Sequence, residues 1–169
     1  MRKLNLDGVE ESKEFVVLPK GLYVAKITKV EDVEDKEYLR VEVDIAEGQY
    51  KDFYKESKFK LNMIKSYKDS ALPFFKSFIT ATEKSNDNFK FNEEKLQELV
   101  GKKLGIVLAE REYKHSSGGI RESLYIYQTR SIEEIRKGDI KIPDIKKLDG
   151  KVTGFTDITD SIIDGDLPF

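Results

Sequence analysis

The chain has 169 residues, of which 38% are hydrophobic and 37% charged, a composition that suits one globular domain of ordinary size. It contains no cysteine, which excludes disulfide frameworks, thiolate metal sites and cysteine nucleophiles. Because it has no apolar leader and no run of about 18 apolar residues, we expect a soluble, unprocessed protein of the cytoplasm.

The charge is distributed unevenly along the chain. The formal net charge is -2, yet residues 152–169 hold four aspartates and no basic residue. The remaining body is therefore weakly basic, so any binding to nucleic acid would depend on local patches and not on the global charge.

Residues 1–20 are mostly polar and are expected to form an N-terminal arm that ends near Pro19 and Gly21. The following run LYVAKITKV is rich in β-branched residues and predicts a first strand with Tyr23, Ala25 and Ile27 on one face. The acidic sequence EDVEDKE, residues 31–37, is expected to be the turn that ends it.

The next segment, YLRVEVDIAEG, alternates between apolar and polar residues and predicts a second strand. Its inward residues are Leu39, Val41, Val43 and Ile45. Its outward residues are Tyr38, Arg40, Glu42 and Asp44.

Aromatic and basic side chains interleave most densely in residues 50–68, YKDFYKESKFKLNMIKSYK. We expect a third strand over residues 50–61. With Phe53, Phe59 and Leu61 facing the core, the period of two places Tyr54, Lys58 and Lys60 outside. Such a segment suits a single-strand platform of stacking rings and phosphate-binding lysines. Taken alone, it suits even better a half-buried strand with a solvated lysine face, which is the commoner cause of such a pattern.

The apolar spacing then changes from two to that of a helix. Ser70 is the expected N-cap, with Pro73 in the first turn and Leu72, Phe75 and Ile79 along one stripe. Phe74 and Phe78 widen this stripe. A second short helix is expected to begin at Asn92, to be stapled by Phe91 and Leu96, and to end at Gly101.

A hairpin follows, with strands over residues 104–113 and 122–129 flanking the sequence KHSSGGI. If Ile106, Leu108, Leu124 and Ile126 face the core, the opposite face carries Arg111, Tyr113, Tyr125 and Tyr127. Lys114, His115, Arg121 and Arg130 lie at the tip and flanks.

Beyond the hairpin, Ser131 and Glu134 predict a capping box for a short helix that ends near Gly138. Residues 143–169 lack sustained periodicity and are expected to be a linker and a flexible acidic tail.

The predicted order of three strands, helices and two strands is that of a mainly β, five-stranded Greek-key barrel of the OB type, here spanning residues 21–142. Such barrels bind single strands through strands two and three and through neighbouring loops. The aromatic and basic patches fall on those surfaces, whereas the acidic turn at residues 31–37 would repel phosphate. The candidate nucleic-acid-binding residues are Tyr38, Arg40, Tyr54, Lys55, Lys58, Lys60, Arg111, Tyr113, Lys114, His115, Arg121, Tyr125, Tyr127 and Arg130.

The sequence offers little for catalysis. His115, the single histidine, lies in a loop rich in serine and glycine without a nucleophile pattern nearby, and no P-loop, HExxH or dinucleotide motif occurs. Acidic pairs such as Glu133 with Glu134 could hold magnesium as in a nuclease, but with 32 acidic residues such pairs arise by chance. We expect no cofactor, no metal and no catalytic residue.

The last ten residues, DSIIDGDLPF, resemble the acidic tip of bacterial single-stranded DNA-binding proteins, in which acids precede an apolar residue, a proline and a terminal phenylalanine. Gly165 departs from that pattern because it interrupts the acidic run. The resemblance implies docking of replication or recombination enzymes through Asp164, Asp166, Leu167, Pro168 and Phe169.

Residues 15–130 are also similar to a phage and mobile-element family of unknown function that occurs among replication and recombination proteins. The resemblance rests on the Pro-x-Gly-x-Tyr entry and on the hydrophobic alternation. It implies a non-catalytic protein that binds single-stranded DNA in a bacterial host cell. Two alternatives are a replisome adaptor whose barrel binds protein and a metal-dependent nuclease.

Overall fold

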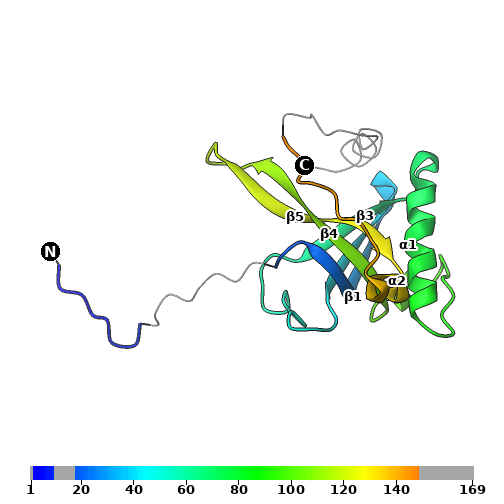
Figure 1. Ribbon diagram of the computed structural model, residues 1–169, viewed down its shortest axis with the longest axis horizontal. Helices are drawn as coiled ribbons and strands as arrows, with labels where there is room; N and C mark the ends of the chain where they lie inside the picture. The colour runs from blue at the N-terminus through cyan, green and yellow to red at the C-terminus, as the bar shows by residue number, and fades with distance from the viewer. Residues whose placement is uncertain (1, 10–17, 149–169) are drawn as a thin grey trace.

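The fold is mainly β, with five strands in one antiparallel sheet. The computed structural model describes residues 2–9 and 18–148. Its strands are β1 (Gly21–Val33), β2 (Tyr38–Ile45), β3 (Leu61–Ser66), β4 (Lys103–Lys114) and β5 (Ile120–Arg130), in the spatial order β3-β2-β1-β4-β5. The helices are α1 (Leu72–Ser85) and α2 (Ile132–Lys137), with short 3-10 turns η1 (Glu34–Lys36), η2 (Asp69–Ala71) and η3 (Leu96–Leu99). Figure 1 shows α1 against one side of the curved sheet.

The central strand β1 organises the sheet because it pairs with both β2 and β4. Tyr23, Ala25 and Ile27 face the core, as predicted. A register irregularity between Ile27 and Lys29 then shifts the pattern so that Val30 is the next inward residue. Such an irregularity bends a strand while its apolar face stays inside.

The turn after β1 is shorter than predicted. The strand continues through the first three residues of EDVEDKE, and only residues 34–37 turn, with Glu37 at a φ of 56°. The strand extends because β2 supplies backbone partners as far as the pair Val33 and Tyr38.

Strand β2 confirms the predicted inward residues, since Leu39, Val41, Val43 and Ile45 are all buried. Its predicted outer face is only partly open. Tyr38 is 1% exposed and Asp44 is 5% exposed. Period two therefore identifies which residues share a face, but it does not make the second face solvent-accessible.

The predicted third strand is wrong in its position. β3 covers Leu61–Ser66, whereas residues 46–60, here called the 46–60 loop, form successive turns. Hydrogen bonds of the i to i+3 kind run from Phe53 N–H to Tyr50 C=O and from Lys55 N–H to Asp52 C=O, both 3.0 Å. Asp52 has a φ of 59°, which no continuous strand allows.

Helix α1 buries Phe78 completely and packs Phe75 and Ile79 against the same core. Leu72 and Phe74 are each 43% exposed, so the predicted stripe is narrower at its start. The predicted cap is also wrong, because Ser70 lies inside η2 and the N-cap is Ala71. η3 forms where the second helix was expected, as a single 3-10 turn ending before Gly101 at a φ of 90°.

The β4–β5 hairpin is confirmed. Ile106 and Leu108 are fully buried, and Leu124 and Ile126 pack against them from β5. β3 and β5, at the two ends of the strand order, also contact each other. The two ends of the sheet are thus close together, with the apolar core inside.

A second, smaller apolar cluster lies on the outer face of β1 and β4. There Ile135 of α2 packs with Val24, Val107 and Tyr127.

The first residues of the predicted linker, 143–148, remain in contact with the sheet. Lys146 N–H donates to Glu110 C=O at 3.1 Å, and Glu112 N–H donates to Lys146 C=O at 2.9 Å.

Candidate nucleic-acid interface

The outer face of the β4–β5 hairpin brings five of the fourteen candidate residues together. Arg111 and Tyr113 of β4 lie across from Ser123 and Arg121 of β5 in the strand register, and Tyr125 follows on the same face. We call Arg111, Tyr113, Arg121, Tyr125 and Tyr127 the tyrosine strip. These residues lie together because antiparallel pairing brings alternate side chains of both strands onto one face.

The centre of the tyrosine strip is a cation–π arrangement. The guanidinium carbon of Arg111 lies 5.5 Å from the centroid of the Tyr125 ring, and the Tyr125 and Tyr127 rings meet edge to face at 6.4 Å. Both tyrosines are half-buried. Rings and a guanidinium plane in this arrangement offer stacking surfaces to unpaired bases and a positive charge to phosphate.

Tyr127 reaches the outer face because of a bulge. The pairs Val107 with Gln128 and Leu108 with Ile126 leave Tyr127 as the extra residue of β5. Its ring packs with the small outer cluster that contains Val107 and Ile135. The bulge therefore places Tyr127 beside Tyr125, and the apolar cluster packs against the Tyr127 ring.

The hairpin tip carries the exposed residues Lys114 and Arg121 and the half-buried His115. The His115 ring lies 6.4 Å from the Tyr113 ring, and its Nδ1 is 2.7 Å from Ser117 Oγ. Gly118 at a φ of 97° lets the chain reverse here. His115 thus shapes the turn, while Lys114 and Arg121 present charge to solvent.

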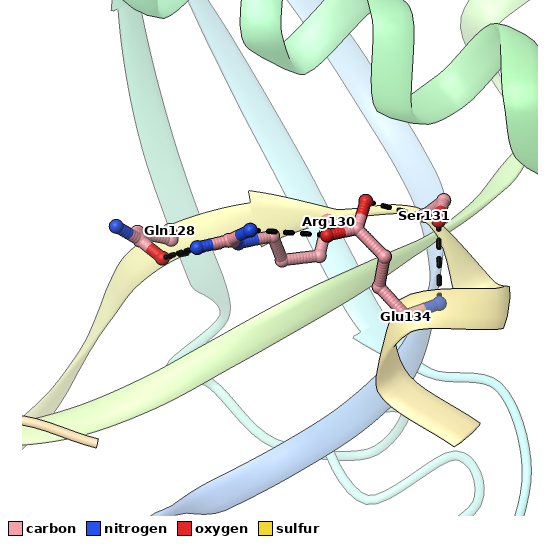
Figure 2. Close-up of polar contacts among 4 residues, drawn as sticks. All are labelled: Gln128, Arg130, Ser131 and Glu134. Atoms are coloured by element: carbon pink, nitrogen blue, oxygen red, sulfur yellow. Dashed lines mark hydrogen bonds and ion pairs between the residues drawn. The ribbon is translucent and has the colours of Figure 1, made fainter. Parts of the chain in front are cut away.

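The Arg130 side chain takes part in the cap of α2, where its charge is already paired with Glu134. Figure 2 shows its guanidinium between Gln128 and Glu134, with Arg130 Nη1 3.0 Å from Glu134 Oε2. Glu134 N–H donates to Ser131 Oγ at 3.3 Å, which confirms the predicted cap. Partial burial alone would raise the pKa of Glu134, but hydrogen bonds from Arg130 and Ser131 outweigh it and lower that pKa.

Three aromatic residues of the 46–60 loop, Tyr50, Phe53 and Tyr54, face inward. Tyr23, Tyr50, Phe53 and Tyr54 form a chain of edge-to-face ring contacts with centroids 5.0–6.3 Å apart, packed against the core. Burial raises the pKa of Tyr23 to about 12. Tyr54 was predicted on the outer face, so that expectation is wrong. In a turn, consecutive side chains such as those of Phe53 and Tyr54 can point to the same side.

The lysines of this loop divide into two kinds. Lys60 Nζ donates to the carbonyl oxygens of Tyr54 at 2.6 Å and of Lys55 at 3.0 Å, so it closes the loop. Lys55 and Lys58 are exposed. The predicted contact of Lys55 and Lys58 with a ligand stays a prediction.

The predicted contacts on β2 are weakened by the structure. Tyr38 is buried and cannot stack on a base without rearrangement. Arg40 Nη1 lies 3.9 Å from Glu31 Oε2, with both side chains partly exposed. β2 therefore contributes at most one cation, and that cation already has an acidic neighbour.

A cavity of about 310 Å³ lies between the outer face of β1 and β2 and the 46–60 loop. It contains both signs of charge, and Lys26 forms an ion pair with Asp52 across it. Asp44, which was expected to point to solvent, is buried and accepts backbone hydrogen bonds from Ile45 and Tyr54. No motif in the sequence indicated these anchoring roles of Lys26, Asp44 and Asp52.

The described residues contain no group of three or more histidine, cysteine or acidic side chains arranged to hold a metal ion. Within the same residues, no helix is long and apolar enough to cross a membrane. The predicted docking residues Asp164, Asp166, Leu167, Pro168 and Phe169 lie outside the described part of the chain.

Comparison with known proteins gives no assignment. No protein-family model matches the chain, and no curated protein matches it in sequence. The function must therefore be argued from the fold and from the tyrosine strip.

Proposed function

We propose that this chain binds single-stranded DNA through an OB-type barrel, without catalysis, in replication or recombination of a phage or mobile element. The fold contributes two supporting observations. The strand order β3-β2-β1-β4-β5 with β3 close to β5 fits a partly open five-stranded Greek-key barrel. Helix α1 lies between β3 and β4 in the chain, as in that fold.

The observation that carries the proposal is the arrangement of Arg111, Tyr125 and Tyr127 on the outer face of the hairpin. The edge-to-face rings and the guanidinium over Tyr125 combine stacking surface with positive charge. A stacked ring contacts the π-face of a base and not its hydrogen-bonding edge. The expected binding is therefore tolerant of sequence, as in other stacking platforms.

The charge around the tyrosine strip supports the same ligand. Arg121 of the strip is exposed near the hairpin tip, and Lys114, which is also exposed, lies at the tip itself. The acids of β4 lie on the other face of the hairpin, where Glu110 pairs with Lys20 and Glu112 with Lys147. A single strand along the tyrosine strip would thus meet cations first.

The test is a titration of fluorescently labelled poly-dT, followed by anisotropy at several salt concentrations. The affinity should fall with salt, with a log–log slope of about −0.7 for each phosphate neutralised. A duplex of the same length should compete poorly. A salt-independent signal, or tighter binding of the duplex, would contradict the proposal.

The proposal has a second part, recruitment of replication or recombination enzymes by residues 164–169. It rests on the sequence resemblance alone. An apolar pocket with a basic rim can hold the Phe169 ring together with the carboxylates of Asp164 and Asp166. Deleting residues 164–169 should abolish capture of such an enzyme by the immobilised protein and leave poly-dT affinity unchanged or slightly higher. Continued capture of the same enzyme would contradict this part.

A further inference from the structure

Phe59 is the most exposed large apolar side chain in the part of the chain that the structure describes, with 83% of its surface open to solvent. The sequence pattern had placed it in the core, in phase with Phe53 and Leu61. Leu61, two residues later, is 7% exposed and begins β3. The ring therefore lies just outside a well-anchored strand and contributes little to folding.

The backbone around Phe59 is held at both ends. On one side, the buried Asp44 carboxylate accepts the N–H of Tyr54 at 3.0 Å. On the other side, Lys60 Nζ donates to the carbonyl oxygens of Tyr54 and Lys55, which ties residues 54–60 into a small closed loop. Phe59 N–H donates to Ser57 Oγ at 3.1 Å within it. Such fixation lowers the ordering cost when an exposed ring binds a ligand.

The charges near Phe59 favour an anionic ligand. Lys58 precedes it directly and is exposed, and Lys55 is exposed on the same small loop. Glu56 is the one carboxylate among residues 55–60. A phosphate backbone passing this loop would therefore meet a net positive charge beside an open aromatic ring.

We propose that Phe59 is a second stacking site for single-stranded DNA, separate from the tyrosine strip, with Lys58 contacting the adjacent phosphate. This inference rests on the proposed function and adds a site to it. The ring stacks on an unpaired base of any type, since every base has a π-face.

The first test uses fluorescence. The chain contains no tryptophan, so Phe59→Trp introduces a single reporter at the site. Its emission should be quenched when poly-dT is added and recover in high salt. The matched control is Phe74→Trp on α1, a 43% exposed ring; Figure 1 shows α1 well apart from the 46–60 loop. Its emission should not change.

The second test uses affinity. Phe59→Ala should weaken poly-dT binding about fivefold or more, as expected for one lost base stack, while Phe59→Tyr should retain it. The melting temperature of Phe59→Ala should match that of the wild type, because the ring is exposed.

The outcomes separate the two claims. If the wild type binds poly-dT and Tyr125→Ala weakens binding, but neither Phe59→Ala nor Phe59→Trp responds, the second site is overturned and the proposed function stands. If the wild type does not bind poly-dT at all, the proposed function fails and the second site fails with it.

Discussion

The β4–β5 hairpin and the 46–60 loop share a composition of tyrosines, phenylalanines and basic residues, yet they use it in opposite ways. In the hairpin, backbone pairing fixes the direction of every side chain, and Tyr125 lies on the outer face under Arg111. In the loop, turns bring Phe53 and Tyr54 together against the core and leave Phe59 in solvent. Composition therefore does not decide whether a ring faces the core or the solvent. The local geometry of the backbone does.

The largest expected effect is a loss of stability caused by a substitution in the 46–60 loop. Phe53→Ala should destabilise the fold by roughly 2–4 kcal/mol, because a half-buried ring between Tyr50 and Tyr54 is lost from the core. Urea unfolding followed by circular dichroism measures it. If stability is unchanged while poly-dT affinity falls, the inner rings of the loop contact DNA and our assignment of them to the core is wrong.

The hairpin should respond in the opposite way. Tyr125→Ala should cost about 1–3 kcal/mol of poly-dT binding, as expected for one stacking ring, and change the free energy of unfolding much less. Val107→Ala, a fully buried position on the same hairpin, is the control that should destabilise the fold. Loss of folding in Tyr125→Ala would instead show that its ring is a structural element.

The smallest effect concerns the ion pairs that close each region, Arg130 with Glu134 after the hairpin and Lys26 with Asp52 in the loop. The pKa of Glu134 is lowered by Arg130 and Ser131, and that of Asp52 is lowered by Lys26. A carboxyl with a lowered pKa in the folded state stabilises the fold above its ordinary pKa. That contribution is lost as the pH falls through the folded-state value.

Glu134→Gln should therefore lower the free energy of unfolding by about 0.5 kcal/mol at neutral pH. The value is small because the ion pair is partly exposed. The difference from the wild type should vanish in acid. Asp52→Asn should show the same sign. Thermal melts between pH 3 and pH 7 test both, and a difference that grows in acid would contradict the assignment.

The sequence predicted correctly those elements in which the apolar residues keep a regular spacing from the first residue to the last. β2, the hairpin and the cap of α2 by Ser131 were recognised because alternation or capping is local. β3 was misplaced because the lysines and rings of residues 50–60 imitate alternation, whereas Asp52 at positive φ and the turn hydrogen bonds depend on Asp44 and Lys60.

The candidate site was predicted in part for the same reason. Arg111, Tyr125 and Lys114 lie where the hairpin pattern placed them. The burial of Tyr38 and the capture of Arg130 by Glu134 depend on tertiary packing. Phe59 was misassigned because an apolar residue in phase with Leu61 is expected inside unless the strand has not yet begun.

The pairing of Lys146 with β4 has a consequence for behaviour at high concentration. β1 covers the edge of β4 only as far as Leu108. Beyond it, Glu110 and Glu112 would present unpaired backbone groups to any other chain, and such edges promote intermolecular sheet extension and aggregation. Lys146 occupies those hydrogen bonds. Truncating the chain before Lys146 should therefore make the protein prone to self-association through this edge.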